Sequence, residues 1–222
     1  MGVGRFIHHI GAFLLLAATV LLIVVDITAP VVNNIALFKI DAGSSGVSFG
    51  TFGYCITRDN ADDNCSKAQI GYNPAQVIQT AAGNNDVDFS GAGENAVKAL
   101  THVMVLHPIA TGLCFIAFLL ALFAGPFGSL LSSLASLLAF LVTVVALACD
   151  FAGFSIVRHR VNRDSNSLNA QWSVAIWLVL AAAILALLGT ILVFLTCCSG
   201  RRRRRRESSK MSAYQASPAA RY

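Results

Sequence analysis

Charged side chains are scarce in this sequence of 222 residues. Only 12% of the residues are Asp, Glu, Lys or Arg, 56% are hydrophobic, and the mean hydropathy is +0.68, whereas a soluble domain carries about 25% charged residues. The sequence also lacks a glycine-rich phosphate loop, a nucleophile elbow, a catalytic carboxylate pair and any cluster at metal-ligand spacing. These absences predict a membrane protein with no catalytic residues, cofactor or metal, and with no site for nucleic acid.

Long hydrophobic runs take up much of the sequence instead. Four of them reach the length of about 20 residues that a helix needs to cross the hydrocarbon core of a bilayer. The first run is longer than the apolar core of a secretory signal and Pro30 follows it, so we predict a retained span. The four predicted transmembrane spans are residues 7–27, 102–123, 130–149 and 173–196.

A run of six arginines after the fourth span predicts the orientation of the protein. Arginine-rich segments beside a span stay in the cytoplasm, and an even number of spans puts both termini on that side. The exception is that Arg158, Arg160 and Arg163 fall in the second extracellular loop, which the same rule disfavours. The predicted cytoplasmic segments are 1–6, 124–129 and 197–222, and the predicted extracellular loops are 28–101 and 150–172.

The first extracellular loop combines strand-forming residues with two cysteines. Residues 35–40 and 47–56 are rich in β-branched and aromatic side chains and are separated by turn residues, so they predict two strands. Cys55 and Cys65 face an oxidising compartment and are expected to form a disulfide that staples this small sheet; the alternative is two unpaired thiols. Asn64 starts an Asn-Cys-Ser sequon, but the crowded backbone beside a disulfide disfavours glycosylation there.

Three ionisable residues, Asp26, His107 and Asp150, lie within or at the edges of the predicted spans. All three fall toward the extracellular end, where they can meet. Ionisable residues in spans are costly unless paired or hydrated, and a His between carboxylates can titrate near neutral pH. The three residues are therefore our candidate pH sensor. The alternative is structural, because His107 precedes Pro108, which frees a backbone carbonyl, and both Asp residues can simply end their helices.

The end of the fourth span combines cysteine with basic residues. Cys197 and Cys198 lie at the predicted membrane edge, where cysteines are often S-acylated; the alternative is a plain stop-transfer anchor with two inert thiols. Each arginine beside an anionic inner leaflet contributes about 1 kcal/mol of attraction. Ser208 is a candidate phosphorylation site, because the preceding Arg205 and Arg206 suit a basophilic kinase, and phosphate there would weaken that attraction. The expected lipid-contacting arginines are Arg201, Arg202, Arg203, Arg204, Arg205 and Arg206.

Several short motifs match a known family. They are FGTFGYC at 49–55, Cys65-Ser66, Gly71-Tyr72, His107-Pro108 and Asp150. In these motifs the sequence resembles the fungal PalI family of tetraspan plasma-membrane proteins, which is related in plan to eisosome-associated tetraspans and more distantly to claudins. The match covers residues 5 to about 200. The predicted fold is an all-α transmembrane four-helix bundle with a small disulfide-stapled extracellular β-sheet in the first loop, and the resemblance implies a claudin-like plan.

The resemblance implies a fungal plasma-membrane protein with an accessory, non-enzymatic role in ambient-pH signalling beside a multi-span membrane sensor. The alternative role is to organise cortical membrane domains, with other tetraspans as partners, and to support cell-wall integrity. A transporter or channel would need a polar path, which the cytoplasmic halves of the spans do not offer. Anionic lipids of the inner leaflet are the other expected partner. Small residues recur every four positions in the third and fourth spans, which favours packing within one bundle over a homo-oligomer.

Overall fold

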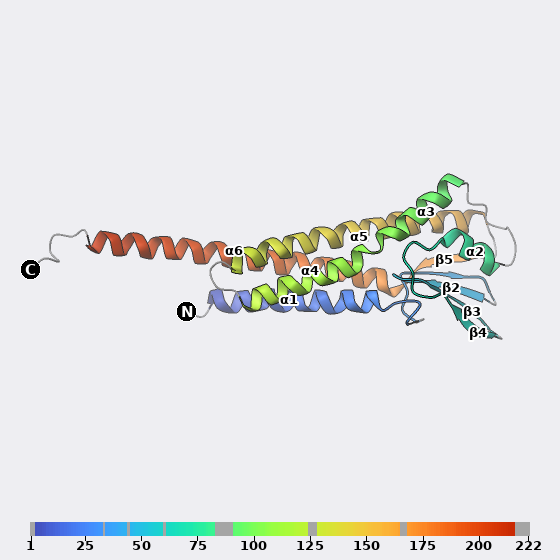
Figure 1. Ribbon diagram of the computed structural model, residues 1–222, viewed down its shortest axis with the longest axis horizontal. Coiled ribbons are helices and arrows are strands. Elements are labelled where there is room, and N and C mark those ends of the chain that lie inside the picture. The colour runs from blue at the N-terminus through green and yellow to red at the C-terminus, as the bar shows by residue number, and fades with distance from the viewer. Residues whose placement is uncertain are drawn as a thin grey trace, which may run out of the picture.

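The computed structural model describes residues 3–32, 34–43, 45–59, 61–82, 91–123, 128–164 and 168–215. Four long apolar helices form one bundle, and a small antiparallel sheet lies at one end of it (Figure 1). We call this end of the bundle the sheet end, and the opposite end, from which the last helix continues toward the arginines, the arginine end. The predicted fold class is confirmed, and the chain is a multi-pass membrane protein. The helical segments that are long and apolar enough to cross a membrane are Phe6–Asp26, Gly93–Leu122, Leu130–Arg163 and Val174–Cys197.

Small residues bring the helices of the bundle together. Helix α1 (Val3–Asp26) packs against α4 (Leu106–Leu122) and α6 (Val174–Gln215), and α5 (Gly128–Asp164) packs against α4 and α6. Lipid tails are as apolar as leucine, so helices associate in a membrane through close packing of small side chains. The fully buried residues at these contacts accordingly include Ala18, Ala110, Ser132, Ser136, Ala182 and Ala186.

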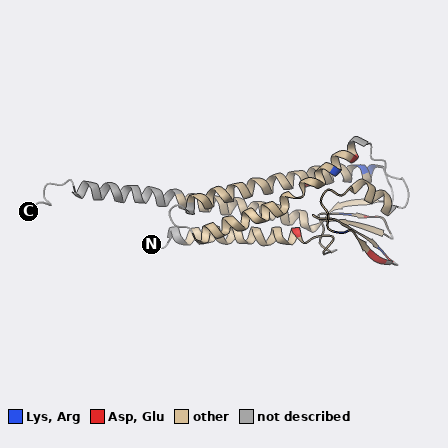
Figure 2. Cartoon of the chain, viewed as in Figure 1, with Lys and Arg blue, Asp and Glu red and all other residues tan. Residues whose placement is uncertain are grey.

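Charged residues gather toward the sheet end, and the middle of the bundle is drawn without charge among the residues described (Figure 2). Helix α5 has 37 residues and is therefore about 55 Å long, well beyond the roughly 30 Å of a hydrocarbon core. Its last turns leave the membrane zone and cover the sheet. Helix α3 (Gly91–Val103) accompanies them, and a break at Met104 and Val105 separates α3 from α4.

The helical course of α5 corrects our expectation that residues 150–172 form a loop. The chain stays helical to Asp164 because Phe154, Val157 and Val161 recur at helical spacing and are buried on one stripe against the sheet domain. Arg158 and Arg163 lie on this protruding part of the helix and are exposed.

The sheet has five antiparallel strands in the order β4-β3-β2-β1-β5. Two differences from the predicted strands stand out. The expected single strand 47–56 is two strands, because the chain turns between Gly50 and Gly53, whose backbone N–H and carbonyl are 2.8 Å apart. The second loop adds a strand that the sequence did not suggest. The strands are β1 (Phe38–Asp41), β2 (Ser45–Phe49), β3 (Tyr54–Arg58), β4 (Ala61–Cys65) and β5 (Asn169–Trp172).

Cys55 and Cys65 lie directly opposite each other on β3 and β4 and form a disulfide, as predicted. Asn64 pairs with Ile56 one position away, and the expectation that it is not readily glycosylated stays a prediction. The bond fastens β4, which is the outer strand of the sheet on that side.

Aromatic side chains form the core between the sheet and the helices. Phe38 on β1 stacks on Phe154 of α5 with ring centroids 5.0 Å apart, and Trp172 of β5 meets Phe38 edge to face at 5.6 Å. Phe49 stacks on Tyr72, which precedes helix α2 (Pro74–Ala82), at 6.1 Å. Burying each large apolar side chain contributes roughly 1.5–3 kcal/mol, so this core fixes the sheet to α5.

At the arginine end, His8 links three helices of the bundle. Its Nε2 lies 2.9 Å from the carbonyl oxygen of Ala121 near the end of α4, and its Nδ1 lies 3.2 Å from the hydroxyl of Thr196 on α6. The carbonyls of the last turn of a helix lack partners within that helix, so the ring satisfies one of them.

Gly50 lies where the sheet meets the end of α1, and its position leaves no room for a side chain. A Cβ atom there would collide with the backbone of Ala29 and the hydroxyl of Thr28. A Cβ atom at Gly112 of α4 would instead meet nothing within 4 Å. The two glycines therefore allow a matched comparison.

We expect Gly50→Ala to lower the free energy of unfolding by roughly 1–3 kcal/mol, the usual cost of overpacking. Gly112→Ala should leave it unchanged or raise it, because alanine favours a helix over glycine by about 1 kcal/mol. Thermal unfolding of both variants in detergent micelles, followed by tryptophan fluorescence, measures the difference. If Gly50→Ala melts at the same temperature as the wild type, the contact of Gly50 with Ala29 and Thr28 is not tight.

Candidate functional site

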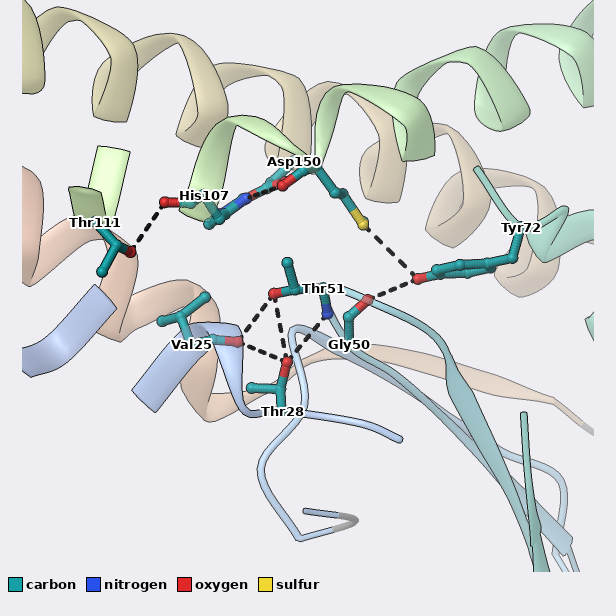
Figure 3. Close-up of polar contacts among 9 residues, drawn as sticks. Val25, Thr28, Gly50, Thr51, Tyr72, His107, Thr111 and Asp150 are labelled. Carbon is teal, nitrogen blue, oxygen red and sulfur yellow. Dashed lines mark hydrogen bonds and ion pairs between the residues drawn. The ribbon is translucent and has the colours of Figure 1, made fainter. Parts of the chain in front are cut away.

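A buried ion pair joins α4 to α5 at the sheet end of the bundle. His107 in the first turn of α4 is completely buried, and Asp150 on α5 is 3% exposed. Nε2 of His107 lies 3.0 Å from Oδ2 of Asp150. Among the residues that the structure describes, neither atom has a hydrogen-bond partner beside this ion pair. Each residue is thus the sole described partner of the other at these atoms (Figure 3).

The second nitrogen of His107 also faces an acceptor. Nδ1 lies 3.2 Å from the carbonyl oxygen of Met104, at the break between α3 and α4. A carboxylate and a carbonyl oxygen can only accept hydrogen bonds, and only an imidazolium carries a proton on both nitrogens. The charged ring can therefore donate to both neighbours, whereas a neutral ring would turn a lone pair toward one of them.

Thr111 connects this ion pair to α1. Its hydroxyl lies one turn after His107, 3.0 Å from the carbonyl oxygen of His107 and 2.7 Å from Oδ2 of Asp26. The other carboxylate oxygen of Asp26 is buried and has no partner among the described residues. The three predicted residues therefore share one site, but Asp26 reaches the ion pair through Thr111 rather than directly.

Hydroxyl groups fasten the sheet to the bundle beside this site. Thr28, just after α1, and Thr51, in the turn between β2 and β3, both donate to the carbonyl oxygen of Val25, at 2.7 and 2.9 Å. The backbone N–H of Thr51 donates to the Thr28 hydroxyl at 3.0 Å. Figure 3 shows these contacts between the end of α1 and the sheet. We call the ion pair, Thr111, Asp26 and these hydroxyls together the junction.

We include Tyr72 in the junction, because it contacts the turn between β2 and β3. Its hydroxyl donates to the carbonyl oxygen of Gly50 at 2.9 Å and lies 3.8 Å from the sulfur of Met104. Complete burial raises the pKa of Tyr72 far above its usual value, and the negative charge of Asp150 raises it further. The phenol therefore stays protonated and keeps donating to Gly50 throughout the physiological pH range.

The predicted lipid-contact, S-acylation and phosphorylation sites lie on α6 toward the opposite end of the bundle. Cys197 is a free, partly exposed thiol near the end of the fourth span. The backbone of α6 continues as a helix through Gln215, but the side chains of Cys198, Ser208 and the six arginines lie outside the described part of the chain. In the described residues no cluster of three or more His, Cys, Asp or Glu side chains could hold a metal ion.

Sequence reasoning did not identify Thr111, Thr28, Thr51 or Tyr72 as members of the site. The spacing of four residues between His107 and Thr111 is a usable signal, since it puts both on one helix face. Thr51 and Tyr72 lie within the quoted motifs FGTFGYC and Gly71-Tyr72, but nothing in the sequence indicated the contact of Thr51 with Thr28, because it depends on how the sheet folds back on α1.

Most of the chain matches a known protein family, and parts of it match individual relatives. A model of the SUR7/PalI family matches residues 7–189. The chain is 35% identical over 108 residues to the pH-response regulator protein palI/RIM9 of Emericella nidulans, covering 49% of this chain and 18% of that relative. It is 32% identical over 191 residues to the palI/RIM9 protein of Yarrowia lipolytica, covering 81% and 22%. With Protein DCV1 of Saccharomyces cerevisiae the identity is 29% over 155 residues, covering 68% and 72%. The chain thus spans about a fifth of the two palI relatives.

Replacing Tyr72 by Phe tests the contact between the junction and the sheet. The variant should lose about 1 kcal/mol of unfolding free energy at pH 7, the usual net value of a hydrogen bond. A raised pKa in the folded protein means that the stabilisation by Tyr72 is complete below its unfolded pKa of about 10 and declines as the pH rises above it. Wild type should therefore lose stability relative to Tyr72→Phe above about pH 10. Parallel stability curves from pH 7 to pH 11 would contradict a buried phenol.

Proposed function

The chain belongs to the SUR7/PalI family, and from this we propose that it is a non-enzymatic accessory of ambient-pH signalling in a fungal plasma membrane. The observation that carries the proposal is the buried pair of His107 and Asp150, which joins two spans beneath a folded sheet. Relatives named as pH-response regulators support the assignment.

The orientation is part of the proposal. The six arginines that follow the fourth span favour a cytoplasmic arginine end, which puts both termini in the cytoplasm and the sheet outside the cell. The disulfide between Cys55 and Cys65 supports this orientation, because disulfides persist in oxidising compartments. The junction then lies at the extracellular side, where it experiences the pH of the medium.

Protonation of His107 is the proposed event. The charged ring donates to Asp150 and to the Met104 carbonyl at once. Loss of the proton in alkaline medium leaves the carboxylate of Asp150 without a cation in a site that excludes water, which is unfavourable enough to change helix packing. The titratable neighbours are Asp150 and Cys149 on α5, Asp26 on α1 and Tyr72, and Tyr72 remains neutral.

A small cavity offers a route for the proton. It has a volume of about 10 Å³ and is lined by Asp150 and Gly153 of α5, by Leu100 and Thr101 of α3 and by Met104, among others. One water molecule needs roughly 10–15 Å³ of such volume. A slight separation of α3 from α5 would admit water to Asp150 from the sheet end.

The proposed partner is a multi-span membrane sensor or another tetraspan. A change at the junction reaches the sheet through Thr51 and Tyr72, so the extracellular sheet is the part whose contacts with a partner would respond to pH. Organisation of cortical membrane domains is the second candidate, and it needs no titrating residue.

Substitution of His107 by Gln separates these roles. Gln keeps a polar side chain but carries no proton that is lost with pH, so the melting temperature of the purified variant should stay constant from pH 7 to about pH 9, below the range in which Tyr72 acts, while that of the wild type falls. A deletion strain that carries His107→Gln should likewise lose its graded growth response to alkaline medium.

His159→Gln is the matched control, because His159 is an exposed histidine on the protruding part of α5. It should behave as wild type in both assays. If His107→Gln keeps the full pH dependence of melting and of growth, the pair is structural and the role in membrane domains is favoured. His107→Phe should reduce expression under either hypothesis.

A further inference from the structure

An apolar groove runs between α5 and α6 at the arginine end of the bundle. Its volume is about 780 Å³, within the range of roughly 300–1,000 Å³ that is typical of ligand sites. Large exposed side chains form its walls, among them Leu134 and Leu137 from α5 and Ile191 and Phe194 from α6. The groove opens toward the lipid and lies at the end of the bundle opposite the junction.

Two small residues make the groove deep. Ser133 on α5 and Thr190 on α6 line it and are 7% and 8% exposed, whereas Leu134 and Phe194 beside them are 65% and 54% exposed. Ser133 and Thr190 thus form the bottom of the groove, and the larger apolar side chains form its sides. This shape fits a flexible hydrocarbon chain.

The residues of the groove favour a lipid over another helix. Helices in membranes approach each other through small residues such as Gly, Ala and Ser. On α5, Ser132 and Ser136 have no exposed surface and are already packed inside the bundle, where Ser132 donates to the carbonyl oxygen of Ala117 on α4 at 3.2 Å. The face that remains toward the groove is rich in leucine, which a partner helix would have to displace.

The arginines beyond the end of the groove indicate which class of lipid the groove binds. Helix α6 continues without a break from Phe194 into the six arginines (Figure 1). Arg201 follows Phe194 by seven residues, which is about 10 Å along a helix axis. A phospholipid with one acyl chain in the groove would therefore have its headgroup at the level of the first arginines. Anionic lipid is attracted there, whereas zwitterionic lipid is not.

We propose that the groove between α5 and α6 binds one acyl chain of an anionic phospholipid whose headgroup lies at the level of the first arginines along α6. This site is independent of the proposed pH response, since it shares no residue with the junction. Failure of one proposal leaves the other intact.

The test uses the full chain in lipid nanodiscs with a phosphatidylserine that carries a photoactivatable diazirine midway along one acyl chain. A phosphatidylcholine with the same acyl chains is the matched probe. After illumination, peptide mass spectrometry should place the adducts on the groove residues of α5 and α6. Phosphatidylserine should label them at least about fivefold more than phosphatidylcholine, which corresponds to a preference of about 1 kcal/mol.

Filling the groove should remove the labelling. Ser133→Phe should reduce the phosphatidylserine adducts about fivefold or more. Thr190→Leu should fill the groove from α6 with the same effect, and it tests the proposal if Ser133→Phe fails to fold. Ala148→Phe is the control, because Ala148 is an exposed small residue of α5 outside the groove, and its adducts should equal those of wild type.

Four results would overturn the proposal. Adducts spread evenly over the four helices, or equal labelling by both lipids, would show unspecific solvation. Adducts that rise in a Cys197→Ser, Cys198→Ser double variant would show that the protein's own S-acyl chain occupies the groove. Crosslinks between two copies through Phe194 would assign the groove to a dimer.

Discussion

The ion pair of His107 and Asp150 is the interaction on which the sheet end of this structure depends. Both groups are withdrawn from water, and each is the other's only described partner at the contacting atoms. Removing one partner of a buried pair typically costs about 3–5 kcal/mol, because the remaining charge is left without compensation. In the proposed mechanism, the loss of one proton from His107 therefore weakens the contact of α4 with α5, which would not happen with an apolar contact at the same place.

A series of contacts connects the ion pair to the sheet. The carbonyl oxygen that His107 faces belongs to Met104, and the sulfur of Met104 lies beside the hydroxyl of Tyr72. The hydroxyl of Tyr72 donates to the carbonyl oxygen of Gly50, and the hydroxyl of the next residue, Thr51, donates to the carbonyl oxygen of Val25 near the end of α1. The sheet itself gains its fifth strand from residues far along the chain, so it cannot shift without affecting the helices that flank it. The described contacts thus run continuously from the ion pair to the sheet.

Much of this arrangement was accessible from the sequence, and the exceptions have physical reasons. Hydropathy marked the four spans, since the bilayer requires long apolar runs, and two cysteines within a β-forming loop predicted the disulfide. The position of His107 and Asp150 near the same end of two spans predicted their proximity. Strand β5 was missed because four residues with little alternation carry almost no signal, and its pairing with β1 is set by tertiary contacts. The role of Thr111 between Asp26 and His107 likewise depends on how α1 and α4 are aligned.

Solid-state nuclear magnetic resonance of the protein in lipid bilayers, with ¹⁵N in its histidine rings, tests the central claim most directly. The signal of His107 is assigned as the one that disappears in His107→Gln. In acidic medium both ring nitrogens should give the shifts of protonated nitrogen, and in alkaline medium one of them should lose its proton. A ring that carries a single proton at every pH, or two at every pH, would contradict the account.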